Sequence, residues 1–245
     1  MTTVVLSAAS QEQPSLQALS GVLDDELRGA GQTDIRSFDL ATTRLSYCQG
    51  EFDCWIKTPG LCRAHDAESE IVQAIHDASQ LVLLDAVTFG GHSYTLKRAQ
   101  DRLICLLSPF FEKRASLTHH AARYDQAASL FALGWTPLPD AEAAETWREL
   151  ADANALNLLS PSVGAVVVDD ADRAQWPAAV RSLLASRIVP GSAIPSRAPL
   201  RKSLLHTAAG APSAASAAVP RSAALVVGSA KTRGTSASEN MARAL

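Results

Sequence analysis

Short apolar runs alternate with longer stretches of mixed polarity along most of the chain. Five of these runs predict β-strands. They cover residues 3–7, 34–40, 81–87, 128–135 and 163–170. Most are continuous in hydrophobicity rather than alternating, which is the pattern of strands that are buried on both faces of a sheet.

The stretches between these runs predict helices. They cover about 15–28, 66–80, 93–109, 140–156 and 172–188. The second begins with Asp66 as a cap, Glu70 in the first turns and apolar Ile71 and Ile75 on one face, a typical helix start. Pro177 lies near the start of the last helix, where proline is tolerated.

Strands that alternate with helices indicate an α/β fold, a doubly wound parallel sheet with helices on both faces. Ligands in such sheets bind beyond the carboxyl ends of the strands. The loops to inspect are therefore residues 7–15, 42–65 and 86–95 and the loop after Trp135.

Composition narrows the class of protein. The chain has 245 residues, 47% of them apolar but only 5% aromatic, with a net charge of −3. The apolar share suffices for a core, and the charge argues against nucleic-acid binding, which needs a basic face. No signal peptide and no run of about 20 apolar residues is visible, and four cysteines do not make a disulfide scaffold. We expect a cytoplasmic protein with reduced thiols and no membrane partner.

The composition changes near residue 189. Residues 189–222 are rich in Ala, Pro and Ser and predict a flexible linker. Order is expected to return at 223–245, where a strand, the loop "GSAKTRGTS" and the start of a helix follow one another. The expected domains are therefore 1–188, the linker 189–222 and a C-terminal strand-loop-helix appendage at 223–245.

The loop after the first strand is a candidate phosphate site. Ser7, Ser10 and Ser15 supply hydroxyl groups next to a helix start, where backbone N–H groups and the helix dipole favour anions. The Gly-Lys-Ser/Thr ending of a nucleotide P-loop is absent. A plain turn with Ser15 as N-cap is the alternative.

The loop after the third strand is a candidate for contact with a flat ring. It consists of Val87, Thr88, Phe89, Gly90 and Gly91. The two glycines allow positive φ or close backbone approach, and Ser93 can cap the next helix. The alternative is a capped strand-to-helix loop in which the glycines are structural.

The segment "CQGEFDCWIKTPGLC", residues 48–62, is the third candidate. It could hold a metal, form a Cys48–Cys54 disulfide or only shape a loop. A tetrahedral zinc site would need Cys48, Cys54, Cys62 and either Glu51 or His65. A reducing compartment disfavours the disulfide.

Several motifs in this order resemble the flavodoxin-like NAD(P)H-dependent FMN reductases, and especially their iron–sulfur flavoprotein branch. The matching runs are "CQGEFDCWIKTPGLCRAHD", "LVLLDAVTFGGHSYTLKRAQDR", "PFF", "THHAARYD" and "LFALGW". The resemblance spans about Tyr47 to Trp135 and more weakly reaches Leu184. It implies a five-stranded sheet, with Ser7, Ser10 and Ser15 at the FMN phosphate and the residues from Val87 to Gly91 along the isoalloxazine ring.

The same branch has four cysteines at positions that correspond here to Cys48, Glu51, Cys54 and Cys62. Glu51 replaces one thiolate, and a [4Fe–4S] cluster normally needs four. We therefore expect no metal, and a loop with free thiols beside the flavin. The first loop also lacks the family's glycines, Ala86 stands in place of a common proline, and Asp85 adds a negative charge.

The resulting hypothesis is an FMN-dependent oxidoreductase that uses NAD(P)H and reduces a flavin, quinone or nitro compound. The flavin carries the chemistry, so no catalytic side chain is named. The resemblance implies a homodimer or homotetramer, and it makes residues 223–245 look like the start of a second flavodoxin-like unit. The alternatives are a degenerate interaction module without flavin and an iron–sulfur electron carrier.

Three further features call for structural explanations. Neighbouring His119 and His120 in an extended segment point to opposite faces, which favours a surface or subunit-contact role over a metal site. Arg123 is a candidate for contact with a dinucleotide phosphate. Cys105 lies on the apolar face of its helix and is expected in the core.

Overall fold

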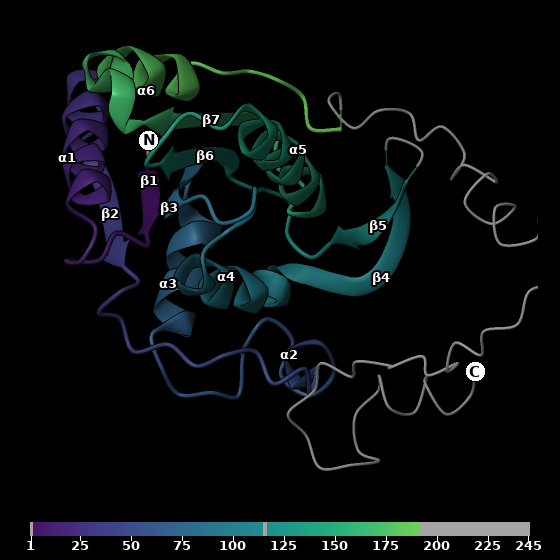
Figure 1. Ribbon diagram of the computed structural model, residues 1–245. Coiled ribbons are helices and arrows are strands. Elements are labelled where there is room, and N and C mark those ends of the chain that lie inside the picture. The colour runs from purple at the N-terminus through teal and green to yellow at the C-terminus, as the bar shows by residue number, and fades with distance from the viewer. Residues whose placement is uncertain (1, 115–116, 192–245) are drawn as a thin grey trace, which may run out of the picture. The chain divides into compact units, whose positions relative to one another are not determined.

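The computed structural model describes residues 2–114 and 117–191 (Figure 1). Five parallel strands form one sheet in the order β2-β1-β3-β6-β7. The strands are β1 (Thr2–Ser7), β2 (Asp34–Asp39), β3 (Gln80–Ala86), β6 (Ser129–Thr136) and β7 (Val163–Asp169). The sequence predicted all five, and the parallel doubly wound α/β fold is confirmed.

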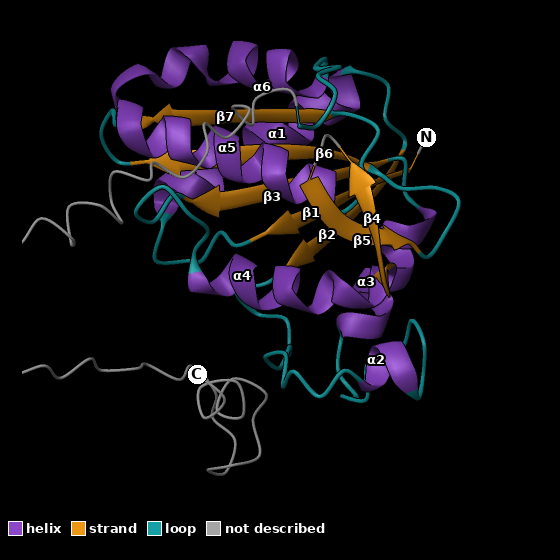
Figure 2. Ribbon diagram, turned by 90° about the vertical axis from the view of Figure 1, so that its right-hand side faces the viewer, coloured by secondary structure: helices purple, strands orange, loops and turns teal. Residues whose placement is uncertain are grey.

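Helices cover both faces of this sheet (Figure 2). The longer ones are α1 (Pro14–Gly29), α3 (Glu68–Asp77), α4 (Tyr94–Gln100), α5 (Ala141–Asn157) and α6 (Trp176–Leu184). Helices α1 and α6 pack on one face and α3, α4 and α5 on the other. Three shorter elements are α2 (Asp53–Ile56) and the 3-10 helices η1 (Asp101–Leu106) and η2 (Asp170–Gln175).

The core consists of two apolar layers separated by the sheet. In β1, Val4 and Leu6 face the layer of α3, α4 and α5, whereas Val5 faces the layer of α1 and α6. All three are buried, which explains why this strand is apolar at successive positions. Burial on both faces stabilises the sheet by about 25 cal/mol for each Å² of apolar surface removed from water.

The prediction of one helix over 93–109 is wrong in its second half. The α-helix ends at Gln100, the chain tightens into η1, and Leu107 is already extended with φ −101° and ψ 155°. An antiparallel hairpin of β4 (Leu107–Arg114) and β5 (Leu117–Ala122) follows. Pro109 accounts for the extended chain after η1 but not for the end of α4 at Gln100, because proline disfavours helical backbone in the residue before it and has no N–H to continue a helix.

Two helix starts correct the sequence interpretation in detail. Helix α3 begins at Glu68, and the predicted cap Asp66 does accept the backbone N–H of Glu68 at 3.1 Å. Helix α1 begins with Pro14, so Gln13, without a side-chain bond, is its N-cap. Ser15 is therefore not the N-cap.

The predicted linker lies outside the described residues from 192 onward, as does the whole appendage 223–245. Both stay predictions. Within the part of the chain that the structure describes, no helix is long and apolar enough to cross a membrane.

Candidate functional site at the carboxyl edge of the sheet

The site lies where the chain changes direction across the sheet. From β1 the chain passes through α1 to β2 on one side, and it then returns to β3 on the other side of β1. The register pairs Ser7 at the end of β1 with Leu84 near the end of β3. Loops that leave adjacent strands toward opposite faces open a crevice, and this is where such sheets bind ligands.

The first loop, residues 8–13, is closed by its own hydrogen bonds. Ser7 Oγ accepts the N–H of Ala9 at 3.3 Å, and Ser10 Oγ lies 3.2 Å from Gln13 Oε1. The N–H of Gln13 donates to the Ser10 carbonyl at 3.0 Å. Ser7 and Ser10 therefore lie in the loop that the sequence indicated, at the carboxyl edge.

Ser15 has partners that the sequence did not predict. Its hydroxyl donates to Asp170 Oδ2 at 2.9 Å, and Arg173 Nη2 donates to Ser15 Oγ at 2.5 Å. Arg173 also forms an ion pair with Asp170 at 3.0 Å, and Trp135 Nε1 donates to Asp170 Oδ1 at 3.0 Å. The 3-10 helix η2, which follows β7, thus brings a carboxylate and a half-exposed guanidinium to the start of α1.

The charge of Asp170 is stabilised by these contacts. Partial burial by itself raises the pKa of the carboxyl, but the hydrogen bonds from Trp135, Ser15 and Arg173 outweigh it and hold the pKa below its ordinary value. The carboxylate is therefore ionised at neutral pH and fixes the Arg173 side chain near the first loop. The sequence offered only a weak indication of the role of Asp170, namely two neighbouring acidic residues at the end of the last strand.

The ring loop, residues 87–91, is a tight turn. Thr88 and Gly91 exchange two backbone hydrogen bonds of 2.9 Å, and the two residues between them have positive φ, 50° at Phe89 and 78° at Gly90. Positive φ at both central positions is the geometry of a type I′ turn. It presents the fully exposed Phe89 ring at its tip.

Glycine is required at position 90 for a second reason. A Cβ built on Gly90 would lie 2.7 Å from the Thr146 Cβ on α5, closer than real side chains approach. A Cβ on Gly91 would meet only the Thr88 carbonyl oxygen at 3.5 Å. A structural reason for glycine therefore exists at Gly90 but not at Gly91, and the ring loop packs directly on α5.

Buried Asp85 anchors the far end of the ring loop. Its Oδ2 accepts the N–H of Ser93 at 2.7 Å, and Ser93 caps α4 by accepting the N–H of Leu96 at 3.3 Å. His92 Nδ1 lies 3.7 Å from the same carboxylate oxygen. Asp85 is therefore a structural carboxylate that holds the residues after the turn.

Two exposed tyrosines come close together on the loops around this edge. Tyr47 follows β2 and Tyr94 begins α4, and their ring centroids are 6.1 Å apart. Both rings are more than half exposed. Together with Phe89 they provide flat apolar surface, of the kind that aromatic ligands contact by stacking or edge-to-face packing.

The cysteine segment, residues 48–62, forms a small pocket at the outer end of α3 and η1. Cys48, Cys54 and Cys62 line it together with Glu51 and Arg102. All three thiols are free. Burial, and then the neighbouring thiols of Cys62 and Cys48, raise the pKa of Cys54 to about 11, so this thiol is protonated at neutral pH.

No group of three His, Cys, Asp or Glu side chains in residues 2–114 and 117–191 is arranged to hold a metal ion. The donor atoms of the cysteine segment therefore do not fit a cluster as they stand.

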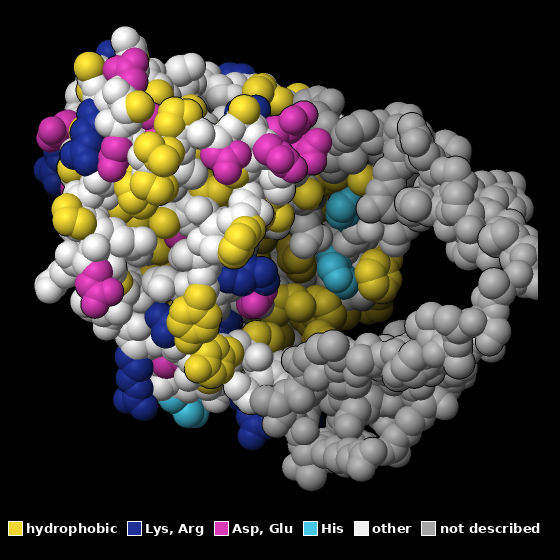
Figure 3. All heavy atoms as spheres, in the orientation of Figure 1, with side chains coloured by type: hydrophobic (Ala, Val, Ile, Leu, Met, Phe, Trp, Pro, Cys, Tyr) yellow, Lys and Arg dark blue, Asp and Glu magenta, His cyan; other side chains and the backbone are white. Residues whose placement is uncertain are grey.

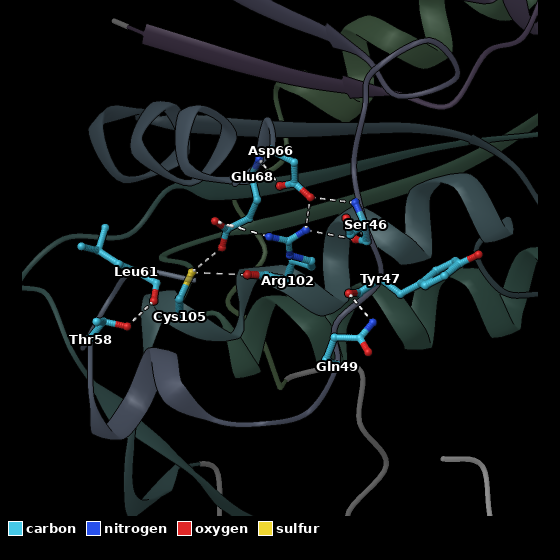
Figure 4. Close-up of polar contacts among 9 residues, drawn as sticks. All are labelled: Ser46, Tyr47, Gln49, Thr58, Leu61, Asp66, Glu68, Arg102 and Cys105. Atoms are coloured by element: carbon cyan, nitrogen blue, oxygen red, sulfur yellow. Dashed lines mark hydrogen bonds and ion pairs between the residues drawn. The ribbon is translucent and has the colours of Figure 1, made fainter. Parts of the chain in front are cut away.

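A buried ion pair secures this segment (Figure 4). Arg102, with a side chain only 1% exposed, donates through Nη1 to Asp66 Oδ2 at 2.7 Å and to the Ser46 carbonyl at 3.1 Å. Its Nη2 lies 3.8 Å from Glu68 Oε2, and the Cys105 thiol donates to Glu68 Oε1 at 3.3 Å. Cys105 is buried, as the sequence predicted.

The pKa values of the two acids around Arg102 are shifted in opposite directions. Burial by itself raises the pKa of Asp66, but hydrogen bonds from Arg102 and from the backbone of Ser46 and Glu68 hold it far below its ordinary value. Burial raises the pKa of Glu68. Asp66 is thus the carboxylate that neutralises Arg102.

The paired histidines belong to the hairpin. The His120 ring packs between Trp55 and Phe111, with centroid distances of 4.8 Å and 4.7 Å, so its role includes joining the hairpin to α2. Arg123 Nε donates to the Leu107 carbonyl at 3.0 Å. The same side chain lines a pocket with Leu81, near the start of β3 and away from the carboxyl edge.

No protein-family model and no curated protein matches the chain. Solved structures do match it in fold. An NAD(P)H:quinone oxidoreductase from Methanothermobacter marburgensis has a TM-score of 0.57 and 16% identity, over 74% of this chain and 94% of that chain. An azoreductase from Bacillus anthracis has a TM-score of 0.51 and 13% identity, over 75% and 95%. An NADH:FMN oxidoreductase in its apo form has a TM-score of 0.50 and 13% identity, over 83% and 98%.

The strand order and these likenesses define a flavodoxin-like fold. At such low identity the likeness concerns the fold alone. The fold expected from the resemblance is confirmed, and membership of the iron–sulfur branch stays a prediction.

Proposed function

We propose that this chain is a flavin-dependent reductase that binds FMN at the β1/β3 crevice, takes reducing equivalents from NAD(P)H and passes them to a small-molecule acceptor. The observation that carries the proposal is the strand order, which places a hydroxyl-bearing loop after β1 and an aromatic turn after β3 at the same edge of the sheet. The fold neighbours, a quinone oxidoreductase, an azoreductase and an NADH:FMN oxidoreductase, support a reductase of this general kind.

The phosphate end of FMN has a suitable environment at the start of α1. Ser10 and Ser15 offer hydroxyl groups, and Arg173 offers a positive charge that is only half buried. Helix α1 has no side-chain cap, so its first N–H groups remain available to an anion. Because Asp170 pairs with Arg173, the two groups together carry no net charge, and Arg173 would serve the phosphate as an N–H donor.

The ring end has a suitable surface in the ring loop. Phe89 projects from a turn that is rigid because Thr88 and Gly91 bond each other. Exposure of the apolar Phe89 ring to water is unfavourable, so a flat ligand that covers the ring would be stabilised by the hydrophobic effect. When bound, FMN would supply the electron transfer chemistry; the residues of this chain would bind and orient it and exclude water from one face.

The decisive experiment compares FMN with riboflavin, which has the same ring and no phosphate. We expect FMN to stay bound through desalting, as judged by the absorption spectrum, and riboflavin to bind more weakly. Arg173→Met is expected to weaken FMN about tenfold, the value of one charge-assisted hydrogen bond, and to leave riboflavin affinity unchanged. Arg187→Met, which removes an exposed arginine at the far end of α6, is the matched control.

The ring contact is tested separately. Phe89→Asn keeps a residue that tolerates positive φ and removes the aromatic surface, so both flavins should lose affinity. Phe110→Asn, on the hairpin, should change neither. A protein that stays colourless with added FMN would contradict the proposal.

A second candidate is an interaction module without flavin. It is favoured by the Ser15 hydroxyl, which already donates to Asp170, and by the absence of glycine from the first loop. The reductase proposal also includes a homodimer or homotetramer, a cytoplasmic location and a flavin, quinone or nitro compound as the acceptor.

A further inference from the structure

The cysteine segment turns back on itself between its second and third thiols. Cys54 lies in α2, and the N–H of Gly60 donates to the Cys54 carbonyl at 2.9 Å. Gly60 has a φ of 85°, a backbone conformation that glycine adopts at little cost. The chain therefore reverses at Gly60 and brings Cys62 back toward α2.

An ion pair closes the same loop from outside. Asp53 precedes Cys54 and Arg63 follows Cys62. Arg63 Nη1 lies 3.7 Å from Asp53 Oδ2, and the N–H of Thr58 donates to the Asp53 carbonyl at 2.9 Å. The residues that flank the two thiols are thus paired with each other, so both cysteines lie inside one closed loop.

The thiols of Cys54 and Cys62 also line the same small pocket and are both half-buried. Cys48 lines this pocket from an exposed position. After burial, the Cys62 thiol raises the pKa of Cys54 more than the Cys48 thiol does, and charge interactions weaken with distance. The remaining thiol, Cys105, is buried and donates to Glu68 Oε1 at 3.3 Å. Cys62 is therefore the thiol best placed to react with Cys54.

Contacts with the rest of the molecule hold this loop in place. The Trp55 indole N–H donates to the Ile104 carbonyl at 3.0 Å, and the Trp55 ring packs on His120 with a centroid distance of 4.8 Å. Figure 3 shows hydrophobic and histidine side chains gathered on the hairpin side of the molecule. A Cβ built on Gly60 would lie 2.7 Å from the Tyr124 hydroxyl oxygen. The loop is thus attached to the body at both α2 and its turn.

We propose that Cys54 and Cys62 form a reversible dithiol–disulfide pair, which responds to the redox state of the small thiols and disulfides around the protein. Disulfides of proteins in reducing compartments are usually transient and redox-sensing, and those near the surface are the readily reduced ones. The proposal does not rest on flavin binding. It also differs from the Cys48–Cys54 disulfide that the sequence left open.

The reaction is a thiol–disulfide exchange with a small disulfide, here oxidised glutathione. The thiolate of one cysteine attacks a sulfur of the small disulfide, whose S–S bond breaks, and one small thiolate leaves with the electron pair. The second cysteine loses its proton and attacks the protein sulfur of the mixed disulfide, and the second small thiolate leaves. The protein loses two electrons and two protons, and the small disulfide becomes two thiols.

Tryptic peptides distinguish the possible pairs. Trypsin cuts after Lys and Arg, so Cys62 falls in peptide 58–63. Cys48 and Cys54 share peptide 45–57. The full chain is equilibrated with oxidised and reduced glutathione, alkylated, denatured and digested without reduction. Mass spectrometry should then find the two peptides joined, with the loss of two hydrogen atoms. A disulfide confined to peptide 45–57, or no disulfide at all, would overturn the proposal.

Single substitutions assign the bond to its two sulfur atoms. Cys54→Ser and Cys62→Ser should each abolish the joined peptides. The matched controls Cys48→Ser and Cys105→Ser should keep them. Joined peptides at undiminished yield in the Cys54→Ser protein would mean that Cys48 is the partner of Cys62, against the proposal. Circular dichroism establishes that each variant is folded.

The contribution of the fold is tested by repeating the equilibration in urea. The folded chain should reach half-oxidation at a several-fold lower ratio of oxidised to reduced glutathione than the unfolded chain, because the folded loop holds the two thiols close together. Equal ratios would show that the fold does not pair these thiols, which contradicts the proposal. Failure to bind FMN would leave these results unaffected.

Discussion

The cysteine segment and the ring loop are held in place by different kinds of interaction. The cysteine segment follows β2, pairs with no strand of the main sheet and is tied to the helical layer through buried Arg102. The ring loop follows β3 and is fixed by its turn geometry and by the fit of Gly90 against α5. The cysteine segment thus depends on an ion pair and the ring loop on steric fit. Different substitutions should therefore destabilise each of them.

The largest expected effect comes from removing the charge. Arg102→Met leaves the Asp66 carboxylate buried and unpaired, and loss of one partner of a buried pair costs about 3–5 kcal/mol in the free energy of unfolding. Denaturant unfolding measures it. Arg98→Met removes a guanidinium that donates to the neutral Leu40 carbonyl and should cost only about 1–2 kcal/mol. Equal losses in the two variants would show that the ion pair is not what holds the segment.

Addition of one methyl group at Gly90 should destabilise the ring loop. Gly90→Ala places a Cβ against Thr146 at positive φ, and we expect a loss of about 1–3 kcal/mol. Gly91→Ala adds the same group where φ is not positive and the nearest atom is 3.5 Å away, so it should stay within about 0.5 kcal/mol of the parent. Thermal unfolding of the pair is the measurement, and a tolerated Gly90→Ala would contradict the tight fit.

The smallest expected effect is a change of stability with pH, and it distinguishes the two loops. The folded-state pKa of Asp66 is lowered, so its contribution is present above the unfolded value of about 3.9 and is lost as the pH falls through the folded pKa. The stability difference between the parent and Asp66→Asn should shrink as the pH falls from 5 to 3. The difference between the parent and Gly90→Ala should not change. Urea titrations at several pH values measure both, and a constant Asp66 difference would sink the electrostatic account.

The sequence predicted the sheet well because continuous apolar strands carry a local signal. Val4, Val5 and Leu6 are buried whichever face they point to, so their succession alone indicates a central strand. The helix after β3 was predicted too long, since residues 101–106 keep helical apolar spacing and only Pro109 marks the change. The two strands of the hairpin beyond it pair only with each other and are not part of the alternation of strands and helices that predicted the main sheet.

The site was predicted only in part because its contacts are long-range. Ser15 and Asp170 are 155 positions apart, and Asp66 and Arg102 are 36 apart. No local pattern links such residues; only the strand order brings them together. The turn at Phe89 and Gly90 was within reach, because a glycine pair after a buried strand already indicates positive φ.

The hairpin of β4 and β5 shares no ladder with the five-stranded sheet. A two-stranded ribbon is marginally stable on its own, and here its attachment to the body includes the His120 ring against Trp55. In native-state hydrogen exchange its amides should therefore open as a separate unit and lose protection first. Those of β3 and β6, at the centre of the sheet, should persist until the whole domain unfolds.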